Sequence, residues 1–124
     1  MSEVLMQIGE VADRTELSIR TVRHYEDIGL ITPSERSAGG FRLYTDSDIE
    51  RLLVIRRMKP LGFSLAQMRE LLDAFDSLNA PNDHTSAAET VRRCQEQLDD
   101  ATRKLQRNLA YADELQSVLA ELLL

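Results

Sequence analysis

The sequence predicts a mainly α-helical fold with one small β-hairpin and one long C-terminal helix. Three observations lead to this prediction: two short helical stretches around a tight turn, a glycine pair between extended segments, and an apolar heptad repeat. The first two lie within residues 8–44 and the repeat within residues 86–124. We therefore expect an N-terminal domain (1–75), a linker (76–85) and a coiled-coil helix (86–124).

The second short helix is expected to begin after Ser18 and to end near Gly29. A serine N-cap satisfies a free amide of the first turn, and glycine tolerates positive φ at a helix end. Ile19 and Val22 share one side of this helix, and residues 17–25 contain no acid. The other side carries Arg20, Thr21 and His24, followed by Tyr25. Arg23 falls nearer the buried edge, but its long side chain can reach outward, so these five residues are the candidate DNA contacts. An apolar back with an arginine-bearing front suits the major groove of DNA, where arginine bonds guanine or phosphate.

A hairpin follows this helix, because Pro33 stops helical structure and Gly39 and Gly40 supply a turn. Its flanking segments are short, so we expect it to lean on the helices. The hairpin region contains Arg36, Phe41, Arg42 and Tyr44, and Lys59 lies further along the chain. A solvated turn with scattered arginines is the alternative interpretation.

Two further helices should complete the N-terminal domain. The first is capped by Thr45 or Asp46, and Pro60 ends or kinks it. The second opens with a capping box formed by Ser64 and Gln67. The apolar positions of the pair are Ile49, Leu52, Leu53, Ile55, Met58, Leu65, Met68, Leu71, Leu72 and Phe75.

The C-terminal helix is expected to open with a capping box of Ser86 and Glu89 and contains no Gly or Pro. About 35 helical residues span about 50 Å. The apolar heptad positions form a stripe along this length that one small domain is too short to cover, so we expect a second chain to cover it. Asn108 interrupts the stripe and favours one register. The predicted dimerisation residues are Val91, Cys94, Leu98, Ala101, Leu105, Asn108, Ala112, Leu115, Leu119 and Leu122.

Four motifs carry a family resemblance: IGEVA (8–12), TVRHYEDIGLI (21–31), GGFRLYT (39–45) and LGFSL (61–65). In this order and spacing they resemble the DNA-binding domain of the MerR family of bacterial transcription regulators. The resemblance implies a winged helix-turn-helix, with the hairpin as a wing along the DNA backbone. It makes Arg36, Phe41, Arg42, Tyr44 and Lys59 the candidate backbone-contacting residues. It also implies an antiparallel dimer that distorts the promoter spacer so that RNA polymerase engages both promoter elements.

Charge and composition limit the other possibilities. The net charge is −6, and the first 75 residues hold 10 Lys and Arg against 12 Asp and Glu. Specific contacts must therefore come from local basic clusters, because the acidic balance weakens non-specific DNA binding. The sequence shows no signal peptide or membrane span, so we expect a soluble cytoplasmic protein.

Cys94 is the single cysteine, which excludes a disulfide framework and gives no metal-ligand cluster with His24 and His84. Its place in the heptads predicts a buried, unreactive thiol, whereas the adjacent Arg92 and Arg93 favour a reactive thiol sensor. The sequence leaves both interpretations open. Many MerR relatives carry a sensing segment after the dimerisation helix. This sequence ends soon after the last heptad, so we expect no cofactor and assign no inducer.

The leading functional hypothesis is a sequence-specific, homodimeric regulator on a palindromic promoter element. The alternative is a coiled-coil adaptor or structural protein whose winged domain no longer binds DNA, which the acidic charge favours. An enzyme is not expected, because the acids are scattered and Gly39-Gly40 lacks a phosphate-loop pattern. The residues do not distinguish activator from repressor.

Replacing Arg23 with Ala should weaken specific DNA binding by about 1–3 kcal/mol, because a base-contacting arginine contributes that much discrimination. Fluorescence anisotropy with a labelled operator duplex measures the change. An unaltered operator affinity removes Arg23 from the base-contacting set.

Overall fold

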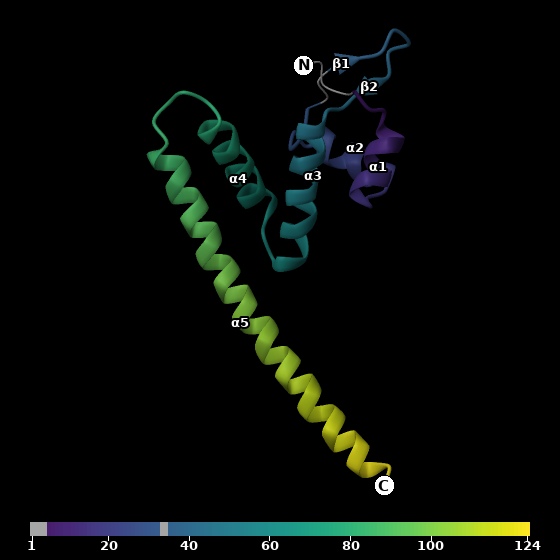
Figure 1. Ribbon diagram of the computed structural model, residues 1–124, viewed down its shortest axis with the longest axis vertical. Helices are drawn as coiled ribbons and strands as arrows, with labels where there is room; N and C mark the ends of the chain where they lie inside the picture. Colours follow the sequence, from purple (N-terminus) through teal and green to yellow (C-terminus); the bar gives the residue numbers. More distant parts are fainter. Residues whose placement is uncertain (1–4, 33–34) are drawn as a thin grey trace.

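A computed structural model describes residues 5–32 and 35–124 of the chain (Figure 1). The described part is mainly α-helical with a two-stranded antiparallel sheet, as the sequence predicts. In chain order the elements are α1 (Ile8–Thr15), α2 (Ile19–Asp27), β1 (Glu35–Arg36), β2 (Arg42–Leu43), α3 (Asp46–Met58), the 3-10 helix η1 (Lys59–Leu61), α4 (Leu65–Leu78) and α5 (Thr85–Leu122). Pro33, expected to stop the helix before the hairpin, lies outside the described residues.

The tight turn between α1 and α2 is closed by hydrogen bonds. The Leu17 amide donates to the Ala12 carbonyl at 3.2 Å, and Glu16 takes a left-handed conformation with φ of 57°. The Ser18 hydroxyl then accepts a hydrogen bond from the Thr21 amide at 3.0 Å. The predicted N-cap is therefore confirmed, and these bonds set the direction in which α2 leaves the turn.

The hairpin pairs Arg36 with Arg42 and turns through Gly40, whose φ of 84° favours glycine. The predicted glycine turn is confirmed. Beyond the hairpin, Tyr44 and Met6 exchange two backbone hydrogen bonds of 2.8 Å each. The segment before α1 thus lies beside the strand that leads into α3, a pairing that no pattern in the sequence indicates.

The joint between α3 and α4 follows the predicted signals. Thr45 caps α3 in a capping box with Asp48, whose carboxylate accepts from the Thr45 amide at 2.9 Å. Pro60 lies in η1, where the α-helix has already ended. Ser64 and Gln67 form the expected capping box of α4. Both turns are therefore specified by local chemistry, and they set the angle between α3 and α4.

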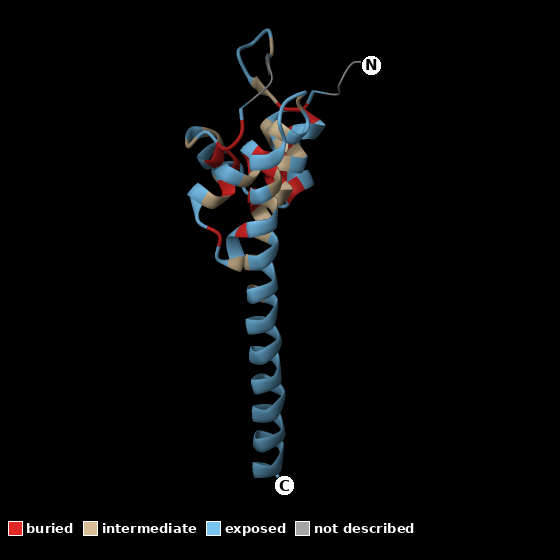
Figure 2. Cartoon of the chain, turned by 90° about the vertical axis from the view of Figure 1, so that its left-hand side faces the viewer, coloured by how far each residue is buried: buried red, intermediate tan, exposed pale blue. Residues whose placement is uncertain are grey.

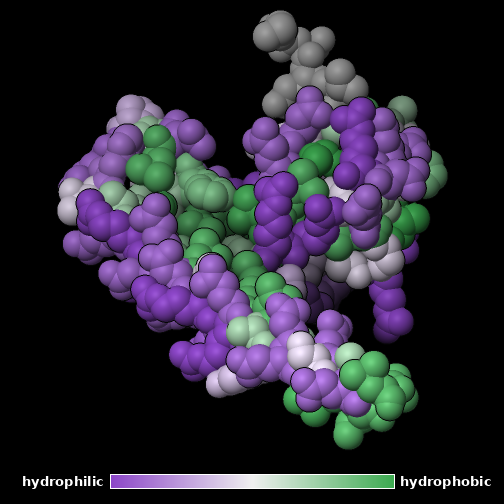
Figure 3. All heavy atoms as spheres, turned by 60° about the horizontal axis from the view of Figure 1, so that its bottom comes forward, coloured by the Kyte–Doolittle hydropathy of each residue, from purple (hydrophilic) through white to green (hydrophobic). Residues whose placement is uncertain are grey.

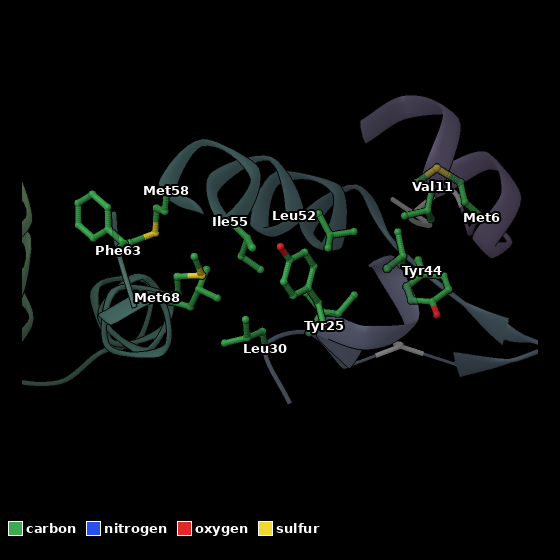
Figure 4. Close-up of a cluster of buried hydrophobic side chains, with 13 residues drawn as sticks. Met6, Val11, Tyr25, Leu30, Tyr44, Leu52, Ile55, Met58, Phe63 and Met68 are labelled. Atoms are coloured by element: carbon green, nitrogen blue, oxygen red, sulfur yellow. The ribbon is translucent and has the colours of Figure 1, made fainter. Parts of the chain in front are cut away.

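The hydrophobic core lies among α2, α3 and α4 and reaches the hairpin through Tyr44 (Figure 4). Leu52 and Ile55 of α3 are fully buried and lie next to the ring of Tyr25. Leu65, expected on the apolar side of α4, is instead exposed because it opens the helix outside this core. The buried cluster comprises Met6, Val11, Val22, Tyr25, Leu30, Ile31, Tyr44, Leu52, Ile55, Met58, Phe63, Met68 and Leu72.

The start of α5 differs from the prediction. The helix begins at Thr85, and the Asp83 carboxylate accepts hydrogen bonds from the Thr85 hydroxyl at 2.7 Å and amide at 3.0 Å. These bonds hold the pKa of Asp83 below its usual value. Ser86 is already inside the helix, so the predicted capping box of Ser86 and Glu89 is wrong.

α5 has two parts with different surroundings. Its first turns pack on α4 through the buried residues Ala87 and Thr90, and Gln67 donates a hydrogen bond to Gln97 at 2.9 Å. Residues 102–124 are exposed throughout (Figure 2). Among the described residues, no helix combines the length and the apolar character needed to cross a membrane.

Candidate nucleic-acid interface

α2 presents basic side chains to solvent on the side opposite its buried face. Val22 is fully buried against the core, whereas Arg20, Arg23 and His24 are exposed. Thr21 is half-buried, and its hydroxyl accepts a hydrogen bond from the Ser18 hydroxyl at 2.9 Å. The core thus orients α2 so that a short basic surface faces outward, which is the arrangement that a major groove accepts.

Two α2 residues lie where the helical wheel did not place them. Tyr25 was predicted to contact DNA, but only 3% of its surface is exposed, and its ring lies in the core (Figure 4). A direct DNA contact by Tyr25 is therefore corrected to a core-packing role. Ile19 was predicted on the apolar side, yet it is 41% exposed because it is the first residue of the helix.

A hollow of about 330 Å³ lies between α2 and the hairpin. Arg23 lines it from α2, and Arg36, Phe41 and Arg42 line it from the hairpin. Phe41 is 64% exposed near the hairpin turn, and Arg36 donates to the Gly40 carbonyl at 3.1 Å. Three arginines therefore line one hollow, in a domain that is not basic overall.

Glu26 connects α2 to the strand that leaves the hairpin. One carboxylate oxygen forms an ion pair with Arg42 at 2.6 Å, and the other accepts a hydrogen bond from the Tyr44 hydroxyl at 2.5 Å. The Glu26 side chain is only 8% exposed, so this carboxylate is almost entirely removed from water. No local pattern in the sequence distinguishes Glu26 from the acids on helix surfaces.

Tyr44 lies inside the protein rather than on the proposed DNA-binding surface. It is fully buried, and burial together with the hydrogen bond to Glu26 raises the pKa of its hydroxyl far above the ordinary value. Its predicted contact with the DNA backbone is corrected for the same reason as that of Tyr25: the ring is inside the protein. Its hydroxyl instead donates a hydrogen bond to the carboxylate of Glu26.

Several arginines outside α2 hold the chain together. Arg56 donates to the Thr15 carbonyl at 2.7 Å and pairs with Glu16 at 3.3 Å. The two others of this kind are Arg51, which bonds the Leu30 carbonyl and Asp76, and Arg69, which bonds the Ile28 carbonyl. By contrast, Arg57 and the predicted backbone-contacting residue Lys59 are exposed where α3 meets η1. A count of charges in the sequence does not distinguish the arginines that bond within the fold from Arg57 and Lys59, because the distinction depends on tertiary contacts.

Cys94 lies half-buried on α5 and packs against the hydrophobic core of its own chain. Burial raises the pKa of the thiol and Glu70 raises it further, while Arg93 lowers it. Among residues 5–32 and 35–124, no group of three or more His, Cys, Asp or Glu side chains is placed to hold a metal ion.

The predicted dimerisation residues fall into two sets. Val91, Cys94 and Ala101 are half-buried within the chain. The remaining members are exposed: Leu98, Leu105, Asn108, Ala112, Leu115, Leu119 and Leu122. The exposed leucines form an apolar stripe that extends beyond the α4 contact, and a stripe of this length is typical of a surface that another chain covers.

A helix-turn-helix followed by a hairpin and a supporting helix pair defines a winged helix-turn-helix protein. Two family models match the chain: the MerR HTH family regulatory protein at residues 6–74 and the MerR DNA-binding region at residues 49–118. The chain belongs to the MerR family of transcription regulators, which bind DNA.

Comparisons with individual proteins agree with this assignment. The chain is 39% identical to the HTH-type transcriptional regulator ZntR of Escherichia coli over 101 residues, which cover 82% of this chain and 69% of ZntR. It is 39% identical to the HTH-type transcriptional activator TipA of Streptomyces coelicolor over 107 residues, 86% of this chain but 39% of TipA. The fold is similar to that of HiNmlR, a MerR family regulator lacking the sensor domain and crystallised with promoter DNA, with a TM-score of 0.75, 21% identity, and coverage of 89% and 80%.

Because the pKa of Cys94 is raised, its thiol should react slowly with iodoacetamide near neutral pH, where little thiolate is present. The rate should increase as pH rises above the usual thiol range, and it should be lower in the folded protein than in urea. Cys94→Ser provides the background. Faster reaction of the folded protein at neutral pH would instead establish a reactive thiol.

Proposed function

We propose that the chain acts as a homodimer that recognises a palindromic promoter element and regulates transcription by distorting the promoter spacer. The observation that carries this proposal is the shared hollow between α2 and the hairpin, which Arg23 lines from α2 and Arg36 and Phe41 line from the hairpin. A helix with a basic outer surface beside an exposed hairpin matches the groove and backbone contacts that specific binding requires.

Within this proposal the exposed residues have separate roles. Arg20, Thr21, Arg23 and His24 of α2 contact base edges and nearby phosphates in the major groove. Arg36 and Phe41 of the hairpin and Lys59 of η1 contact the backbone on either side. Phosphate contacts fix the position of the protein on the duplex, while base contacts supply the sequence preference.

The apolar surface of α5 supports dimerisation. Leu98 and Cys94 border an apolar groove that Met58, Leu61 and Phe63 also line (Figure 3). This groove is continuous with the exposed leucine stripe of α5. A second copy of the chain covers both at once, and a two-fold dimer matches a palindromic site.

The heptad positions give a specific register for an antiparallel pair, the orientation that the MerR resemblance implies. Opposing the two apolar series places Cys94 across from Leu119 of the partner subunit and sets Ala101 across from Ala112. Leu98 and Leu115 form the layer between them. Near the two-fold axis, Asn108 faces Leu105. The other layers join apolar or small side chains.

Distortion of DNA is the mechanism that the MerR resemblance implies for such a dimer. Binding energy from the phosphate and base contacts offsets the cost of bending and untwisting the spacer, so that RNA polymerase engages both promoter elements. Binding without activation holds the promoter in an unproductive form. The regulatory part of this proposal draws support from relatives named as transcriptional regulators and activators.

The first test is binding-site selection from random duplex DNA at two salt concentrations, with the purified full chain. We expect enrichment of one inverted repeat and an affinity that falls as salt rises, because phosphate contacts release counterions. No enrichment at either concentration contradicts the proposal and favours the adaptor hypothesis, in which α5 binds a partner protein.

The second test is cross-linking through the single natural cysteine. Under mild oxidation, Leu119→Cys should give a covalent dimer on non-reducing gels, because Cys94 and position 119 of the partner subunit are adjacent. The wild-type chain should remain monomeric on the same gel, since its two Cys94 residues lie at opposite ends of the pair. Leu119→Cys combined with Cys94→Ser is the matched control. Cross-linking of the wild type instead would contradict the antiparallel arrangement.

A further inference from the structure

We propose that Glu26 is a positioning residue that keeps Arg42 bound to the protein and fixes the hairpin against α2. Arg42 then neutralises no DNA phosphate, although it lies in the proposed interface. This inference rests on the DNA binding proposed above, and it assigns different roles to two arginines of the same hairpin, Arg36 and Arg42.

The geometry around Glu26 supports the assignment. Both carboxylate oxygens have partners: Arg42 at 2.6 Å on one and the Tyr44 hydroxyl at 2.5 Å on the other. The side chain of Glu26 is 8% exposed, whereas that of Arg42 is 39% exposed. Arg36, in contrast, is exposed and donates to the uncharged carbonyl of Gly40.

The balance of electrostatic costs explains why Arg42 stays with Glu26. If the guanidinium moved to a phosphate, it would leave a nearly buried carboxylate without its counter-charge. Breaking one side of such a pair costs more than a solvent-exposed charge contact returns. The approaching DNA is itself negative and increases that cost. Arg42 therefore remains paired when DNA binds.

The same contacts determine where the hairpin lies. β1 and β2 are two residues long each, too short to hold an orientation on their own. Arg42 and Tyr44 lie two positions apart along one extended segment, and both reach Glu26 of α2. The hairpin is thereby tied to the helix whose outer surface it must accompany onto DNA. Specific binding should depend on this link, because α2 and the hairpin contact DNA together.

Salt dependence of binding separates the two roles of arginine, because each neutralised phosphate contributes about 0.9 to the slope of log K against log salt. The measurement uses the full chain and a mixed-sequence duplex, with four proteins: wild type, Glu26→Gln, Arg42→Gln and the double variant. Arg36→Gln, made in the wild-type and Glu26→Gln backgrounds, is the matched control for an ordinary phosphate-contacting arginine of the hairpin.

We expect the effect of Arg42 to depend on Glu26. Arg42→Gln should leave the slope unchanged in the wild-type background and should reduce it by about 0.9 in the Glu26→Gln background, where the freed guanidinium contacts phosphate. Arg36→Gln should reduce the slope equally in both. A reduction by Arg42→Gln in the wild type overturns the proposal. If Arg42→Gln does not fold, an unchanged slope for the isosteric Glu26→Gln overturns it as well.

A measurement without DNA tests the link itself. In a double-mutant cycle of urea unfolding, Glu26→Gln and Arg42→Gln should be coupled by about tenfold in the folding equilibrium constant. Additive effects overturn the positioning role. If the wild-type chain shows no salt-dependent DNA binding, the proposed function fails, whereas this coupling still decides whether Glu26 holds Arg42.

Discussion

The burial of Val22 and Tyr25 of α2 in the same hydrophobic cluster as Leu52 and Ile55 of α3 is the constraint on which the rest of the molecule depends. Once this side of α2 is buried, the direction in which Arg20, Arg23 and His24 point is fixed. The turn before α2 and the hairpin after it are then positioned relative to that surface. A small core with few aromatic side chains can do this because each buried residue contacts several elements.

The charge distribution becomes intelligible once the arginines are divided by what they contact. Arg51, Arg56 and Arg69 bond backbone carbonyls that no regular element satisfies, and thereby join α3 and α4 to the helix-turn-helix. These three arginines form bonds within the fold, whereas Arg20 and Arg23 of α2 are directed to solvent. An acidic domain can therefore carry a locally basic surface, and the acidic remainder disfavours indiscriminate attraction to nucleic acid.

Much of the fold could be predicted from the sequence because its turns are specified locally. The residues that specify the turns each act on neighbours within four positions, so the sequence alone reveals them. They are Ser18, Gly29, Thr45, Ser64 and the glycines of the hairpin. The helical wheel failed at Ile19, Tyr25 and Leu65, where the shape of the core decides exposure rather than periodicity.

The candidate site was harder to predict because it depends on contacts between distant residues. The helical wheel placed Arg23, which is exposed, nearer the buried edge, whereas the exposure of Arg20 and His24 followed from the pattern of α2. The burial of Tyr44 and the role of Glu26 did not, since both depend on an 18-residue separation that only the folded chain closes. Glu26 and Tyr44, which position the hairpin next to α2, are therefore harder to identify from the sequence than the exposed side chains of α2.

The exposed end of α5 connects stability to chain concentration if the proposed dimer forms. Helices in proteins gain most of their stability from packing, and residues 102–124 have no such packing within the chain. Under the proposed dimer, the folded population and the occupancy of a two-fold DNA element both increase through mass action. Occupancy should then rise more steeply than in proportion to the amount of protein. If the proposed dimer forms, the abundance of the chain is itself an input to the DNA occupancy.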